Sequence, residues 1–134
     1  MKILLICSKN FYGQLDDISK KLKANGHEIF FPNCYDNPQT ESLYRGTPEH
    51  AKFKAEMFKR SENTISQMDA VLTINMSKNG VENYIGGATF LELYDAFRLG
   101  KKIFLYNPPP QGILNDEIIG FSPIVINGNL DLVK

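Results

Sequence analysis

Residues 83–108 read NYIGGATFLELYDAFRLGKKIFLYNP, which is a glycine turn followed by an amphipathic helix and an apolar strand. Phe90, Leu93 and Phe97 mark the apolar side of the helix, where we expect it to be buried. The strand occupies residues 101–108 and ends at a proline. A continuous apolar strand directly after a helix is typical of a parallel sheet with helices on its faces.

The same alternation of strand and helix continues on both sides of this stretch. Apolar segments of strand length lie at 2–7, 27–32, 69–76 and 123–127. Helical periodicity is found at 12–26, from 47 to about 68 and at 88–100, with a short helical turn near 116–119. These elements predict an α/β fold in three layers, with a doubly wound, flavodoxin-like sheet of five parallel strands in the order 2-1-3-4-5. We expect residues 1–134 to form one domain, because the chain is too short for two cores.

One connection in this pattern is long. Residues 33–46, NCYDNPQTESLYRG, are polar and rich in turn formers, so we expect a loop there. A loop of that length in a compact domain is often functional or mobile. TPEH (47–50) follows it, and we expect Thr47 to be the N-cap of the next helix, with Pro48 at its first position.

Composition excludes several classes of function. Hydrophobic residues make up 43% of the chain and the formal net charge is zero, which gives no electrostatic argument for a nucleic-acid partner. No apolar run approaches membrane-spanning length, and MKILLICSKN at the N-terminus is interpreted as a buried strand rather than a signal peptide. Cys7 and Cys34 are too few for a disulfide framework, so we expect two free thiols and a cytoplasmic protein.

Ligands of such sheets bind at the carboxyl ends of the strands, near the switch point between strands 1 and 3. That edge carries residues 7–13, 33 onward, 75–87 and 107 onward. Asp69 opens a strand at the opposite edge and is interpreted as a turn residue. His27 and His50 are isolated, and no spacing resembles a metal site.

Glu92 has two interpretations. The sequence TFLE at 89–92 matches a capping box, in which Glu92 would only stabilise the start of a helix. Alternatively, Glu92 is a reactive group, because it leans toward the sheet beside Leu93. Gly86 and Gly87 would then let a ligand approach the backbone closely. The pattern alone leaves both interpretations open.

The loop after the first strand, CSKNFYG (7–13), is a second candidate site. It offers Ser8, Lys9, Tyr12 and Gly13 at the start of a helix, where free backbone N–H groups and a lysine could bind a phosphate. The loop matches neither a P-loop nor a dinucleotide fingerprint, so an ordinary polar loop is the alternative. The group Lys52, Lys54, Lys59 and Arg60 is interpreted as the solvated face of a helix.

The segment GGATFLELYDAFRLGKKIFLYN resembles the nucleoside 2-deoxyribosyltransferase superfamily, which includes the 2′-deoxynucleoside 5′-phosphate N-hydrolases. Glu92, Ala96, Gly100, Lys101 and Ile103 are in step with the pattern of that superfamily. The resemblance implies that Glu92 is the nucleophile that attacks the anomeric carbon of deoxyribose. It also implies a homodimer, in which a neighbouring subunit completes the site. We expect no cofactor.

Two positions depart from the pattern of catalytic members. Ser61 and Gly86 stand where those members usually have aspartates, so the groups that hold the substrate or protonate the leaving base are not evident. Glu62, Tyr12 and Tyr84 are the candidate proton donors.

We therefore expect cleavage or transfer of the N-glycosidic bond of a 2′-deoxynucleoside or its 5′-monophosphate. The expected cleft around Glu92 includes Ser8, Asn75 and Gly87. The alternatives are a non-catalytic nucleotide-binding or signalling module and a different glycosidic substrate, such as a nicotinamide nucleotide.

Overall fold

The computed structural model describes residues 1–134 and contains one sheet of five parallel strands. The strands are β1 Lys2–Ile6, β2 Glu28–Phe30, β3 Ala70–Thr73, β4 Lys102–Leu105 and β5 Ile124–Val125. Their order is β2-β1-β3-β4-β5, and every neighbouring pair is parallel. The predicted doubly wound topology is confirmed, although each strand is shorter than the apolar segment that predicted it.

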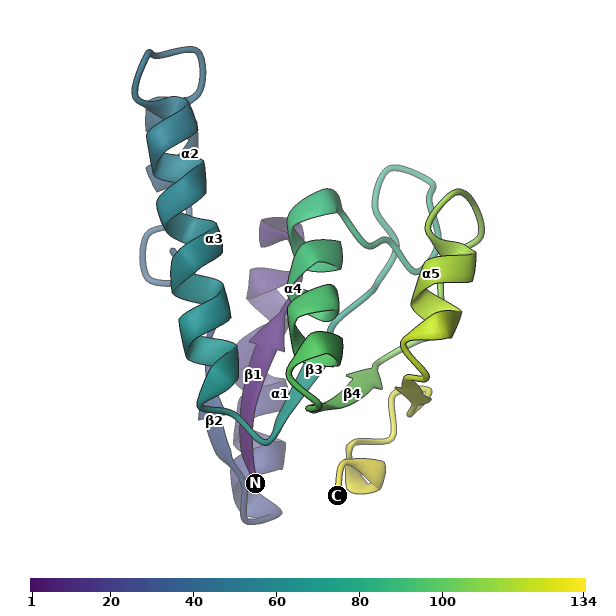
Figure 1. Cartoon of the computed structure of the whole chain (residues 1–134). Coiled ribbons are helices and arrows are strands. Elements are labelled where there is room, and N and C mark those ends of the chain that lie inside the picture. Colours follow the sequence, from purple (N-terminus) through teal and green to yellow (C-terminus); the bar gives the residue numbers. More distant parts are fainter.

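Helices cover both faces of this sheet (Figure 1). They are η1 Lys9–Gln14, α1 Leu15–Ala24, α2 Thr40–Tyr44, α3 His50–Ser66, α4 Gly87–Arg98, α5 Asn115–Gly120 and η2 Leu130–Leu132. Helices α3, α4 and α5 lie on one face and α1 lies on the other, while α2 and the first half of α3 extend beyond the carboxyl ends of the strands. No helix is both long enough and apolar enough to cross a membrane.

Successive residues of the strands enter two separate cores, because side chains alternate across a sheet. Ile3 and Leu5 of β1 pack toward α1, in one cluster with Leu15 and Leu22. Leu4 and Ile6 pack toward α3, α4 and α5, in the other cluster. Both faces are therefore apolar, which explains why the strands are continuous apolar runs rather than alternating ones.

The region before α3 differs from the prediction. Residues 33–46 are not a loop throughout, because they contain α2. Thr47 does not cap α3, which begins at His50 after Glu49. Instead, the Thr47 backbone N–H and hydroxyl both donate to the Tyr44 carbonyl oxygen, at 2.9 and 2.6 Å. Thr47 thus closes the end of α2, and the turn it forms delays the start of α3.

Asn75 joins the loops that follow β3 and β4. Its amide nitrogen donates to the Asn107 and Pro108 carbonyl oxygens at 2.9 and 3.0 Å. Its Oδ1 atom accepts from the Asn107 N–H at 2.9 Å. The side chain is fully buried, so these bonds make Asn75 part of the scaffold at the edge where the strands end.

Candidate functional site

A cavity of about 440 Å³ opens at the carboxyl edge of the sheet, beside the switch point between β1 and β3. Its walls come from the loop after β1, residues 32–45, α3, the loop before α4 and the first two turns of α4. The charged side chains that line it are Lys9, Glu41, Arg45, Lys54, Lys78 and Glu92. It therefore combines two carboxylates with four cations.

The start of α4 decides between the two interpretations of Glu92. The helix begins at Gly87 with Gly86 as N-cap, so Thr89 is already inside its first turn. Glu92 then lies in the second turn, beyond the reach of the N-cap, and no side chain caps the helix. The capping-box interpretation is wrong. Phe97 also differs from the prediction, since it is 49% exposed and the buried side of α4 is Thr89, Leu93 and Ala96.

Because α4 begins at the cavity wall, its free backbone donors are part of that wall. The first intrahelical bond joins the Phe90 N–H to the Gly86 carbonyl oxygen at 2.9 Å. The N–H groups of Gly87, Ala88 and Thr89 precede it and have no partner within the helix. All three residues line the cavity, where they can donate to an anion.

Glu92 lines the floor of the cavity and keeps an edge open to it, with the rest of the side chain packed in protein. Burial raises the pKa of its carboxyl to about 7 and Asp95 adds to the rise, while hydrogen bonding by Ser61 and the charge of Lys54 oppose it. A carboxyl with such a pKa in a cavity is typical of a functional site.

Ser61 links the floor of the cavity to its far wall. Its hydroxyl accepts a hydrogen bond from the Asn33 amide nitrogen at 2.8 Å, and the same nitrogen donates to the Met57 carbonyl oxygen at 3.1 Å. The Tyr12 hydroxyl donates to the Asn33 carbonyl oxygen at 3.0 Å. Ser61 is thus a neutral hydrogen-bond donor beside Glu92. Catalytic members of the superfamily that the sequence resembles usually have an aspartate at this position.

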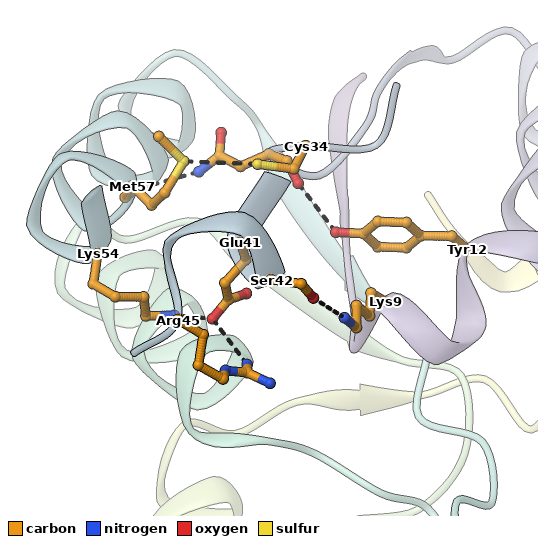
Figure 2. A network of polar contacts seen from close by, with 9 residues as sticks. Lys9, Tyr12, Cys34, Glu41, Ser42, Arg45, Lys54 and Met57 are labelled. Carbon is orange, nitrogen blue, oxygen red and sulfur yellow. Dashed lines mark hydrogen bonds and ion pairs between the residues drawn. The ribbon is translucent and has the colours of Figure 1, made fainter. Parts of the chain in front are cut away.

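The second carboxylate of the cavity belongs to α2 (Figure 2). Glu41 accepts from the Lys54 ammonium at 3.1 Å and pairs with Arg45 at 3.6 Å, while the Lys9 ammonium donates to the Ser42 hydroxyl at 3.2 Å. Partial burial alone would raise the pKa of Glu41, but the hydrogen bond and charge of Lys54, with Arg45 and Lys9, bring it below its ordinary value. Glu41 is therefore ionised at neutral pH.

Both cysteines line the cavity as free thiols. Cys7 is buried, and burial together with the charge of Glu92 raises its pKa to about 12. Cys34 is half-buried, and its Sγ atom lies 4.0 Å from the Met57 Sδ atom. Burial likewise raises the pKa of Tyr12, so its hydroxyl keeps its proton.

The structure brings most of the predicted site residues together. Seven of them line this one cavity: Ser8, Lys9, Tyr12, Ser61, Gly86, Gly87 and Glu92. Gly13 and Asn75 lie outside it, the latter because its amide is used between loops. Glu62 also lies outside and pairs with Arg98 at 3.4 Å on the surface.

Four charged residues of the cavity were not predicted, and one of them is Lys78 in the loop between β3 and α4. Glu41 and Arg45 belong to α2 and its C-terminal end, in a segment expected to be a loop. Lys54 was interpreted as part of a solvated helix face, yet its side chain is only 27% exposed and points to Glu41. For Glu41 and Arg45, the polar composition of 33–46 was the only signal in the sequence. No group of three or more His, Cys, Asp or Glu side chains could hold a metal ion.

Comparison with solved structures finds the same fold in two enzymes. The CMP N-glycosidase BcmB of Clostridium botulinum superposes with a TM-score of 0.54 and 16% identity, over 99% of this chain and 98% of the other. FerB of Paracoccus denitrificans, a flavoenzyme NAD(P)H:(acceptor) oxidoreductase, gives a TM-score of 0.51 and 17% identity, over 93% of this chain and 74% of the other. No protein-family model matches the chain, and no curated protein matches it by sequence.

Proposed function

We propose that this protein cleaves the N-glycosidic bond of a 2′-deoxynucleoside or its 5′-monophosphate, with Glu92 as nucleophile. The observation that carries the proposal is the place of Glu92, a carboxylate without a capping role at the floor of a cavity at the switch point of the sheet. The shared fold with a CMP N-glycosidase supports a nucleotide substrate.

The charges of the cavity favour the phosphorylated substrate. Lys9, Arg45, Lys54 and Lys78 outnumber the two carboxylates, so an anion is attracted. The phosphate of a nucleoside monophosphate can use Lys9, Ser8 and the free N–H groups at the start of α4. A neutral nucleoside would leave those donors unpaired, and we therefore rank the monophosphate first.

The reaction is a double displacement at C1′ of the sugar. The ionised Glu92 attacks C1′ as the bond to the base nitrogen breaks, and the base leaves with the electron pair and takes up a proton. The product of this step is a glycosyl ester of Glu92. Water then attacks C1′ and gives up a proton to solvent while the ester bond between C1′ and Glu92 breaks, which releases the sugar and returns the carboxylate. If a second base attacks in place of water, the outcome is transfer.

The proton for the leaving base has no carboxylic acid to supply it. Glu62 does not line the cavity and pairs with Arg98 on the surface, and Lys54 and Arg45 hold Glu41 ionised. The cavity donors that remain are hydroxyl and ammonium groups, among them those of Tyr84 and Lys78. This observation favours slow turnover, and it keeps a non-catalytic nucleotide-binding module as the second candidate function.

A panel of nucleosides and 5′-monophosphates, with both ribose and deoxyribose, separates these candidates. The proposal predicts release of free base, measured by chromatography, with the highest kcat/KM for a deoxynucleoside monophosphate. Tight binding of one nucleotide without any release would establish the binding module instead. A ribonucleotide as best substrate would retain the reaction class and correct the sugar.

We further propose that the protein is a homodimer that uses an aromatic surface of α4 and α5. Phe90, Tyr94 and Phe97 of α4 surround Phe121, with ring centroids at 5.7, 6.3 and 5.4 Å from it. Tyr94 and Phe97 remain 45% and 49% exposed, which is uncommon for clustered aromatic rings on a monomer. Packing α4 against its copy would cover them and bring the two cavities near the interface.

Light scattering on the purified protein should therefore report a dimer at micromolar concentration. Phe97→Asp should give a folded monomer, because a charge on this surface opposes its burial. Ile113→Asp is the matched control, since Ile113 is 93% exposed and lies outside the aromatic surface. A monomeric wild type, or a dimer unaffected by Phe97→Asp, would remove this surface as the interface.

A further inference from the structure

Helix α2 forms part of the wall of the cavity and has little apolar support, unlike Tyr35 earlier in the same segment, which packs on the core. Helix α2 buries no residue, and its Leu43 side chain is 71% exposed. The contacts between α2 and the rest of the cavity wall are the Glu41–Lys54 pair, the Lys9–Ser42 hydrogen bond and a stack of Tyr44 on Phe53 at 4.7 Å. Helix α2 is therefore held against the rest of the cavity largely by polar contacts.

Glu41 and Ser42 of α2 also engage three of the four cations of the cavity. Figure 2 shows Glu41 between Lys54 and Arg45, with Lys9 directed to the neighbouring Ser42. These three cations and Glu41 all line the cavity. An anionic ligand that enters meets cations whose charge Glu41 already offsets in part.

We propose that Glu41 is a specificity-determining residue, whose carboxylate competes with the phosphate of the ligand for Lys9, Arg45 and Lys54. This inference rests on the proposed function in one respect, namely that the natural ligand carries a phosphate. A phosphate has more charge and more acceptor oxygens than one carboxylate, so it can displace Glu41 from these cations. A ligand without a phosphate leaves the Glu41–Lys54 pair intact and gains nothing from the cations.

The test compares two ligands on the wild type and on Glu41→Gln. One ligand is 2′-deoxyribose 5-phosphate, which has the phosphate but no glycosidic bond to break, and the other is an unphosphorylated deoxynucleoside. Calorimetric titration at fixed ionic strength should show about three- to ten-fold tighter binding of the sugar phosphate to Glu41→Gln, because the displaced pair is partly exposed. The affinity for the deoxynucleoside should stay unchanged.

Two further variants make the result specific. Asp36→Asn removes the same charge from an exposed position of the same segment outside the cavity, and it should leave both affinities as in the wild type. Lys54→Met should weaken binding of the sugar phosphate and spare the deoxynucleoside. Thermal melting of each variant confirms that it is folded. If Glu41→Gln does not fold, Glu41→Ala takes its place, and it should likewise bind the sugar phosphate more tightly than the wild type does.

The proposal is overturned if Glu41→Gln binds the sugar phosphate equally or more weakly, or if both ligands change alike. It is also overturned if neither protein binds the sugar phosphate. None of these outcomes depends on base release, so a failure here is distinct from a failure of the proposed reaction.

Discussion

Glu92→Gln should lower the rate of base release by about 10³-fold or more, because the amide keeps the shape of the side chain but cannot act as the nucleophile. Nucleotide binding should persist. The folded state should not lose stability, since burial raises the pKa of Glu92 and its ionised form is therefore unfavourable in the fold. Base release measured under single-turnover conditions, together with a binding titration, checks both parts.

The control for this substitution is Glu62→Gln. Glu62 is an exposed carboxylate that pairs with Arg98 and does not line the cavity, so its loss should leave the rate within about two-fold, as is usual for surface positions. Equal rates of base release in wild type and Glu92→Gln would remove Glu92 from the mechanism. A large loss in Glu62→Gln would instead restore it as the proton donor.

The pH profile should have an acid limb near pH 7, because only ionised Glu92 attacks C1′ and its pKa is about 7. Below that pH, kcat/KM should fall by about ten-fold per unit. Ser61→Ala should move the limb to higher pH, since the Ser61 hydroxyl lowers the pKa of Glu92 by hydrogen bonding. Activity that instead rose as the pH dropped from 8 to 6 would make Glu92 a proton donor rather than a nucleophile.

The same raised pKa has a consequence for stability. Between the ordinary pKa of 4.5 and about 7, the folded state holds a proton on Glu92 that the unfolded state has lost. The contribution of Glu92 to stability therefore falls as the pH rises through this range. Against Glu92→Gln the wild type should lose on the order of 1–3 kcal/mol, less than the full shift implies because the carboxyl keeps an edge open to the cavity.

The fold could be predicted because the signals that determine it are local. Each strand is a continuous apolar run, since both of its faces are covered, and each helix has its own periodicity. Thr47 shows where prediction from local signals fails. Its residue type suits an N-cap, but the structure uses its hydroxyl to close α2, and only the backbone of the preceding turn decides that.

The site could be predicted in part, for a similar reason. Ser8, Gly86 and Glu92 follow from the rule that ligands bind at the carboxyl edge and from the position of the glycines. The match of TFLE to a capping box does not hold in the structure because Gly86, in an extended conformation, starts α4 three residues before Thr89. A match to Thr-x-x-Glu does not contain the residue at which the helix begins.

Glu41 and Lys54 could not be predicted because their role depends on a tertiary contact. The two residues are thirteen positions apart and belong to different helices, which meet only because a turn reverses the chain between α2 and α3. Helical periodicity places Lys54 on the polar side of α3. Nothing in the sequence indicates that α2 lies over Lys54. Phe97 was misassigned for the converse reason, since an apolar residue at helical spacing can equally face another surface of the molecule.

The central claim is that Glu92 forms a covalent bond with the sugar. A substrate analogue with fluorine at C2′ slows both displacement steps and lets the glycosyl-enzyme accumulate, because fluorine destabilises the oxocarbenium-like transition state. Mass spectrometry of the protein after incubation with a 2′-fluoro-arabinosyl nucleoside 5′-monophosphate should show one added sugar phosphate, on the peptide that contains Glu92 and not in Glu92→Gln. Release of one equivalent of base without any adduct, or an adduct on another residue, would contradict the account.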